Sequence, residues 1–167
     1  MMEDDHLGYV YSSSFCSDEE ALVEAKREWP AMTNHRVVRF KSGRRERPWV
    51  GNVFAIGNAY AFVEPLESTG LLMITRAVTS LVRAFPIGGD TVAAKRFVNR
   101  TTALDWDRLR WFLAAHYKFN RRSESRFWQA VRADVDISGL EDALELYRAS
   151  GQLSLMTRSI RSQLQES

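Results

Sequence analysis

A run of four apolar residues between two glycines limits the fold of this chain more than any other feature of its sequence. Val53-Phe54-Ala55-Ile56 lies between Gly51 and Gly57, and such a run is typical of a strand buried on both faces of a sheet. A strand of that kind needs neighbours, yet only residues 8–15 and 36–40 have the composition of further strands. Three short strands do not form a stable sheet by themselves. The sequence therefore predicts a few N-terminal strands that belong to an incomplete sheet.

The remainder of the chain is predicted to be helical. Ser17 and Glu20 form a capping box, which predicts a helix that ends at Pro30. Apolar residues at helical spacing from Leu71 to Phe85 predict a long helix that ends at Pro86-Ile87-Gly88-Gly89. Further helices are predicted at residues 90–119 with Asp90 as the cap, at residues 127–131, and from a capping box at residues 138–141 to Gly151. The fold class is accordingly α+β and mostly helical.

Composition excludes several classes of protein. With 45% hydrophobic and 26% charged residues among 167, the chain is globular rather than disordered. Its 23 basic and 21 acidic side chains are scattered and give a net charge of +2, so neither a nucleic-acid nor a membrane partner is expected. The most apolar stretch, residues 70–86, is interrupted by threonine, serine and arginine residues, whereas a membrane span needs about 20 apolar residues.

The cysteine count and the N-terminal residues bear on location and on metals. The single Cys16 allows no intramolecular disulfide and no multi-cysteine metal site. Residues 1–15 lack the basic and apolar regions of a signal peptide. We therefore expect a cytoplasmic protein that binds no metal.

The residues with the clearest chemical potential lie where the apolar run leads into the long helix. The first N–H groups of a helix have no partner within it, and the helix dipole favours negative charge there. Thr69 and Gly70 occupy those positions, which predicts an anion site. Glu67 lies just before the helix and should remain ionised, so it could act as a base. The same residue types also serve as simple helix caps, and that structural role is the alternative.

The stretch Gly57-Asn58-Ala59, followed by Phe62-Val63-Glu64-Pro65-Leu66-Glu67-Ser68-Thr69-Gly70, resembles the signature of flavin-dependent tryptophan halogenases. The resemblance extends in order over about 120 residues, which is more specific than one motif. Its other segments are Gly8 to Ser13, Ser17 to Glu20, Ala115-His116-Tyr117 and Phe127-Trp128.

The resemblance implies a fold for the whole chain. Residues 1–167 are identified as a single C-terminal portion of a flavin-monooxygenase-like, Rossmann-type halogenase. Within it, residues 1–57 would form residual sheet and one helix, residues 58–70 the flavin, halide and active-site loop, and residues 71–167 a helical substrate-side region. This assignment would also explain the isolated buried strand.

The resemblance also implies an activity and a set of site residues. In the family, reduced FAD, dioxygen and chloride give hypohalous acid, which passes through a tunnel to an indole held apart from the flavin. Glu67 is implied as the active-site glutamate that helps to remove the ring proton. The implied halide-binding positions are Thr69 and Gly70, and those lining the flavin are Asn58 and Leu71.

The substrate side is implied to be aromatic. The residues that resemble substrate-binding positions of the family are His116, Tyr117, Phe127 and Trp128. An aromatic pair suits an indole because flat rings bury area and stack, although helix packing explains Phe127 and Trp128 equally well. Ser123 stands where the resemblance leads us to expect an acidic group for the substrate ammonium, with Glu124 adjacent. Free tryptophan, another indole and a carrier-bound group therefore all stay open as substrates.

Two requirements of the implied chemistry have no counterpart in the sequence. No Gly-x-Gly-x-x-Gly turn for a dinucleotide occurs, and the four lysines lie outside any segment that matches the surroundings of the family's catalytic lysine. We therefore expect a halogenase portion that is inactive alone, with an N-terminal half and a flavin reductase as possible partners. The alternatives are a non-catalytic helical interaction module and one half of a split flavin monooxygenase.

Overall fold

The computed structural model describes residues 7–64 and 66–151. These residues are mostly helical, with a few short strands, as the sequence predicts. The elements in chain order are α1 (Asp18–Glu28), β1 (Gly43–Arg44), β2 (Trp49–Val50), β3 (Val53–Phe54), the 3-10 helix η1 (Gly57–Ala59), β4 (Ala61–Phe62), the 3-10 helix η2 (Leu66–Ser68), α2 (Thr69–Gly88), α3 (Val92–Phe119), α4 (Arg126–Asp134) and α5 (Glu141–Ser150).

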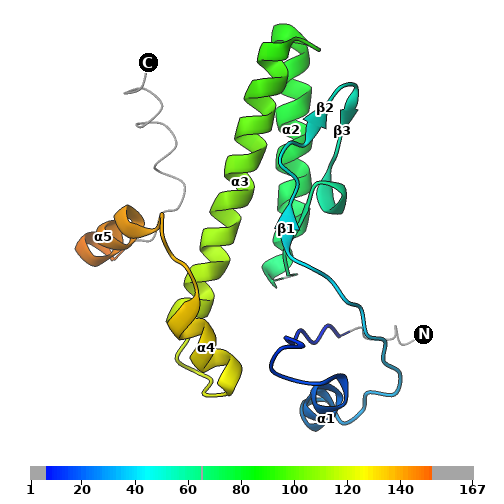
Figure 1. The fold of residues 1–167 in the computed structure, drawn as a ribbon, viewed down its shortest axis with the longest axis vertical. Coiled ribbons are helices and arrows are strands. Elements are labelled where there is room, and N and C mark those ends of the chain that lie inside the picture. The colour runs from blue at the N-terminus through cyan, green and yellow to red at the C-terminus, as the bar shows by residue number, and fades with distance from the viewer. Residues whose placement is uncertain (1–6, 65, 152–167) are drawn as a thin grey trace.

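The centre of the fold is an antiparallel pair of long helices, α2 and α3 (Figure 1). One apolar cluster joins the start of α2 to the middle of α3 beneath η1 and β4; its buried members are Tyr60, Ala61, Met73, Trp106, Leu109 and Leu113. A second cluster packs Trp49 of β2 against Ala84 and Val98 near the other end of the pair. The short strands are thus held by the helix pair, and they carry the chain back to the start of α2.

The turn between α2 and α3 differs from the predicted one. Helix α2 continues through Pro86 to Gly88, since a proline in the last turn removes only one backbone hydrogen bond near the helix end. Thr91, not Asp90, caps α3, because its side chain accepts a hydrogen bond from the N–H of Ala94. Asp90 forms an ion pair with Lys95 at 2.5 Å instead.

The strands correct three expectations. Val53–Ile56 is not a strand buried on both faces: only Val53–Phe54 pairs, with β2 across a turn at Gly51, and Val53 is 63% exposed. β1 pairs with β4 in a second antiparallel ladder. Residues 8–15 and 36–40 form no strand, because pairing needs a partner and the composition of one segment does not supply it.

Helices α1 and α4 lie near the lower end of this pair in Figure 1, and α5 lies to the side of α3. The capping box of α1 forms as predicted: the N–H of Glu20 donates to Ser17 Oγ at 3.2 Å, and the N–H of Ser17 donates to Glu20 Oε2 at 2.8 Å. Helix α4 is longer than residues 127–131 and is capped by Ser125. The predicted capping box at residues 138–141 is wrong, because Leu140 precedes α5 and no side chain caps that helix. Within the described residues, no helix is long and apolar enough to cross a membrane.

Candidate functional site

The first part of the candidate site is the contact between η1 and the start of α2. Gly57 has a φ of 56°, and a Cβ added there would lie 3.1 Å from Ile74 Cγ1, so a glycine allows this close approach. Asn58 is exposed on η1 and Leu71 is exposed on the first turn of α2. The structure therefore places the two predicted flavin-lining residues on neighbouring elements, with their side chains open to the surface.

The second part is the link from η2 into α2. Ser68 adopts a left-handed conformation with φ of 51°, and among the described residues no other non-glycine residue has a positive φ. The Thr69 hydroxyl donates to the carbonyl of Leu66 at 3.0 Å, and the side chain of Ser68 does not cap α2. The N-cap residue of α2 thus leaves the first N–H groups of the helix without its side chain as a partner. The halide-binding role of Thr69 and Gly70 stays a prediction.

The predicted catalytic residue lies on this link. The backbone of Glu67 belongs to η2, and its side chain lies outside the described residues. The residues around it are fixed by packing, since Val63 and Leu66 both contact the apolar cluster of Tyr60, Met73 and Trp106. The backbone position of Glu67 is thus set by its neighbours.

A hydrogen bond that the sequence did not predict joins this link to the end of α3. The Tyr117 hydroxyl donates to Glu64 Oε2. Burial raises the pKa of Tyr117 well above its ordinary value, and the hydrogen bond to Glu64 and its negative charge add to the rise. The one available signal was the position of Glu64, a carboxylate between the apolar residues Val63 and Leu66.

Three of the four predicted substrate residues line one cavity of about 770 Å³. Its walls come from α4, from α5, from the end of α3 and from the segment that precedes α2. The lining residues are Glu64, Leu66, Ala115, His116, Tyr117, Phe119, Asn120, Arg121, Arg122, Trp128, Leu144 and Tyr147. Phe127 is not among them. A cavity of this size can enclose a molecule as large as an indole derivative.

The aromatic residues around the cavity contact one another. The Tyr117 and Trp128 rings stack with centroids 5.5 Å apart at 25°. Phe127 packs edge-on against Tyr117 at 6.0 Å and against Phe15 of the N-terminal segment at 5.6 Å. Nδ1 of His116 lies 2.8 Å from the carbonyl of Phe112, one helical turn before it. These contacts are consistent with a packing role for Phe127, and the substrate-binding role of the four residues stays a prediction.

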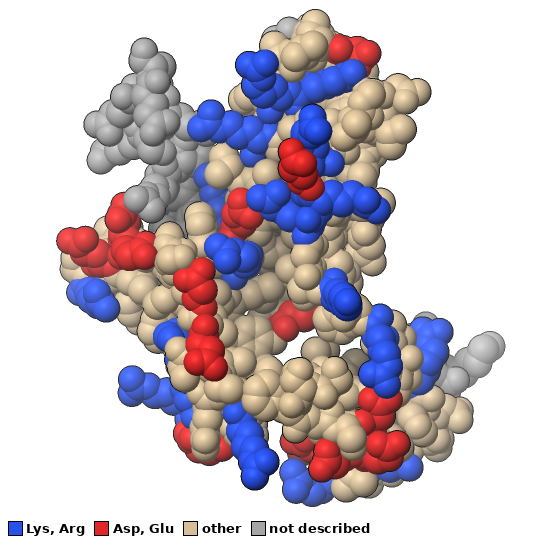
Figure 2. Space-filling model, in the orientation of Figure 1, with Lys and Arg blue, Asp and Glu red and all other residues tan. Residues whose placement is uncertain are grey.

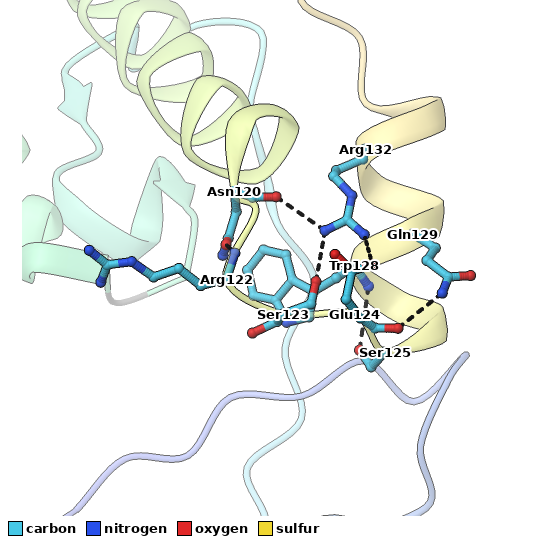
Figure 3. Close-up of polar contacts among 8 residues, drawn as sticks. All are labelled: Asn120, Arg122, Ser123, Glu124, Ser125, Trp128, Gln129 and Arg132. Atoms are coloured by element: carbon cyan, nitrogen blue, oxygen red, sulfur yellow. Dashed lines mark hydrogen bonds and ion pairs between the residues drawn. The ribbon is translucent and has the colours of Figure 1, made fainter.

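One arginine organises the connection between α3 and α4 (Figure 3). Arg132 donates to the carbonyls of Asn120 at 3.1 Å and Ser123 at 2.7 Å, and it pairs with the Glu124 carboxylate at 2.7 Å. Glu124, the acidic neighbour of Ser123, is therefore engaged by a cation within the chain. At Ser123 and Glu124, the connection thus has one carboxylate, that of Glu124, and it is paired with Arg132.

On the face seen in Figure 2, charge does not mark a separate site. Figure 2 shows acidic and basic side chains mixed over the visible face. Among residues 7–64 and 66–151, no three His, Cys, Asp or Glu side chains are grouped so that they could hold a metal ion.

Comparisons with known proteins point to one family. The family model described as tryptophan halogenase matches residues 1–162. The tryptophan 7-halogenase KtzQ of Kutzneria sp. (strain 744) is 43% identical over 146 residues, which cover 85% of this chain and 27% of that protein.

Solved structures agree with the sequence comparison. MibH, a tryptophan 5-halogenase, has a TM-score of 0.76 at 47% identity, covering 83% of this chain and 27% of its own. BrvH, a flavin-dependent halogenase from Brevundimonas sp. BAL3, has a TM-score of 0.76 at 33% identity. The match covers 92% of this chain and 32% of BrvH. The chain thus spans about a third or less of the length of these relatives.

Proposed function

The chain belongs to the tryptophan halogenase family, and from that premise we propose that it is the C-terminal portion of a flavin-dependent halogenase that chlorinates an aromatic ring of the indole type. The observation that carries the proposal is the link from η2 into α2, where Glu67 precedes a helix start that the side chain of Ser68 does not cap. This link lies inside the segment that the family model matches.

The described residues fit one edge of a flavin and halide site. FAD, when bound and reduced, would supply the oxidation of chloride by dioxygen to hypochlorous acid. Asn58 and Leu71 would contact the flavin from neighbouring elements, and both are exposed. The N–H groups of Thr69 and Gly70 would hold the chloride, because a helix start favours an anion.

Glu67 would act on the substrate. When the ring carbon gains chlorine, it must lose its hydrogen as a proton, so that a C–Cl bond forms and a C–H bond breaks. A carboxylate beside the ring can take that proton and can stabilise the positive charge that the ring carries until then. The backbone of Glu67 is held close to the wall of the cavity, since its neighbour Leu66 lines the cavity.

The substrate side of the proposal rests on the cavity of about 770 Å³. His116, Tyr117 and Trp128 would present ring faces to an indole, and Phe127 would support Tyr117 and Trp128 from behind. Because Arg132 already pairs with Glu124, the connection between α3 and α4 does not favour the ammonium group of a free amino acid. An indole without a free ammonium group is the better fit to this wall.

Two partners belong to the proposal. An N-terminal halogenase segment would supply the dinucleotide-binding turn and the catalytic lysine, and a flavin reductase would supply reduced FAD. In this arrangement the three parts expected from the sequence keep their roles, with residues 1–57 as scaffold, residues 58–70 as the reacting loop and residues 71–167 as the substrate side. The chain alone would not halogenate.

The test compares the chain alone with the chain mixed with the N-terminal segment of a relative such as KtzQ. FAD is titrated while tryptophan fluorescence is followed, and chlorination of an indole is then measured with reduced FAD, dioxygen and chloride. The proposal expects flavin binding and chlorination only in the mixture, and loss of chlorination with unchanged flavin binding in Glu67→Gln. Glu28→Gln, an exposed carboxamide substitution on α1, is the control. Full chlorination by Glu67→Gln would contradict the site, and a chain that never binds flavin would favour a non-catalytic module.

A further inference from the structure

The hydrogen bond between Tyr117 and Glu64 connects two segments that are 53 residues apart. Tyr117 lies in the last turn of α3, and Glu64 follows β4 on the way to η2. Both residues line the cavity, together with Leu66. The bond therefore closes one corner of the cavity at the point where the chain turns into the segment that carries Glu67.

Packing contacts fix the position of each partner of this hydrogen bond. The ring of Tyr117 stacks on Trp128 at 5.5 Å and meets Phe127 edge-on at 6.0 Å, so its hydroxyl is directed by packed rings. Glu64 lies between Val63 and Leu66, which both pack against the apolar cluster beneath η1. A hydrogen bond between groups that are already placed loses little entropy when it forms, and it transmits position well.

The segment after Glu64 needs such support. Ser68 has a left-handed backbone conformation, which costs a non-glycine residue free energy and persists only where its surroundings fix it. The hydrogen bond from the Thr69 hydroxyl to the carbonyl of Leu66 fixes one side of the strained residue. On the other side, the contact from Glu64 to α3 is the polar anchor.

We propose that the Tyr117 hydroxyl is a positioning group: by its hydrogen bond to Glu64 it holds η2 and the first turn of α2 against the end of α3, and so places Glu67 and the halide-binding N–H groups. This inference rests on the proposed function for its catalytic meaning. The Tyr117 hydroxyl donates its hydrogen bond to Glu64, so Tyr117 would contact a substrate through its ring face.

Hydrogen exchange of the 167-residue chain tests the anchor without any need for activity. Tyr117→Phe keeps the ring and removes the hydroxyl. It should speed exchange of the amides of residues 73–76, whose hydrogen bonds go to the carbonyls of the first turn of α2, about tenfold, the factor expected for one lost hydrogen bond to a charged group. Glu64→Ala should have the same effect, whereas Glu64→Gln keeps an acceptor and should stay within about threefold of the wild type. Tyr11→Phe is the matched control, because it removes a hydrogen bond that lies elsewhere in the chain. The Tyr11 hydroxyl donates to Asp18 Oδ1 at 2.8 Å.

The outcomes separate this inference from the proposed function. Unchanged exchange of residues 73–76 in both Tyr117→Phe and Glu64→Ala would overturn the anchor, whatever Glu67→Gln does. If Tyr117→Phe speeds exchange everywhere, including residues 98–113 of α3, the variant has loosened the whole chain. The comparison of Glu64→Ala with Glu64→Gln then tests the anchor. In the mixture that chlorinates indole, Tyr117→Phe should lower kcat about tenfold with KM within about twofold, and a rise in KM alone would show that the hydroxyl contacts substrate instead. Full chlorination by Glu67→Gln would contradict the proposed function and leave the exchange result standing as a structural anchor.

Discussion

At the scale of single residues, a side-chain amide replaces a missing strand neighbour. Asn99 of α3 accepts a hydrogen bond from the N–H of Trp49 at 2.7 Å and donates to its carbonyl at 3.0 Å. Trp49 is 5% exposed, so its backbone groups have little access to water. The pair of bonds thus binds β2 to the helix pair as a neighbouring strand would.

Asn99→Ala should therefore destabilise the chain. The substitution leaves the N–H and the carbonyl of Trp49 without partners in a buried place, which costs about 1–3 kcal/mol of unfolding free energy. Urea unfolding followed by tryptophan fluorescence measures the change. Asn52→Ala, at an exposed position in the β2–β3 turn, should have an effect near zero, and an equal loss in both variants would contradict the argument.

Gly139 is a second residue with a defined steric role. Its φ is 94°, and a Cβ added there would lie 2.7 Å from Cζ2 of Trp111, so Gly139→Ala combines backbone strain with an overlap. We expect a loss of about 1–3 kcal/mol of unfolding free energy and a changed near-ultraviolet spectrum of Trp111. Gly8→Ala meets no atom within 4 Å and should leave both unchanged.

At the scale of elements, the sequence predicted features that depend on a few consecutive residues. It missed features that depend on residues far apart in the chain. The capping box at Ser17 needs only four consecutive residues, and it forms as predicted. The strand expected at Val53–Ile56 depends on distant neighbours, and only two of its residues pair. The candidate site divides in the same way: Glu67 to Gly70 are contiguous and could be proposed from sequence, and their roles stay predictions, whereas Glu64 and Tyr117 meet only in the fold.

The connection between α3 and α4 is an element held by one side chain. Arg132 is largely buried and bonds two carbonyls and one carboxylate of residues 120–124. Arg132→Ala should cost about 1–2 kcal/mol of unfolding free energy and should speed exchange of the amides of residues 120–126. Arg36→Ala, at an exposed position before β1, is the control. Unchanged exchange in residues 120–126 would show that the aromatic contacts of α4 alone hold the connection.

At the scale of the whole molecule, two tyrosines whose pKa values are raised make stability depend on pH in the alkaline range. Burial, and then a hydrogen bond to Glu24 and its charge, raises the pKa of Tyr9 to about 12, and the pKa of Tyr117 is raised further. The ordinary pKa is about 10, so the folded state binds these protons more tightly than the unfolded state. Their contribution is complete below about pH 10 and is lost as the pH rises towards and past about 12.

Unfolding free energy should therefore fall steadily above about pH 10. Tyr9→Phe and Tyr117→Phe remove one of the two groups each, so each should make this fall shallower. Urea unfolding at several alkaline pH values measures the slope. Tyr117→Phe should also remove the latest phase of phenolate absorption in a pH titration. Identical slopes in wild type and in both variants would contradict the raised pKa values of these two tyrosines.

The exposed face of α2 is the place where the proposed N-terminal halogenase segment would be expected to pack. Leu71 is 69% exposed, and Val78 and Val82 extend the same stripe at helical spacing, while the opposite side of α2 already packs on α3. Val82→Asp should leave the melting temperature of the chain alone almost unchanged, because an exposed valine contributes little to its own fold. The same variant should weaken assembly with the N-terminal segment at least tenfold, because it would bury an unpaired charge. Sedimentation of the mixture measures assembly, and Arg83→Asp, on the neighbouring exposed position, controls for charge alone; if both variants assemble like the wild type, the segment packs elsewhere.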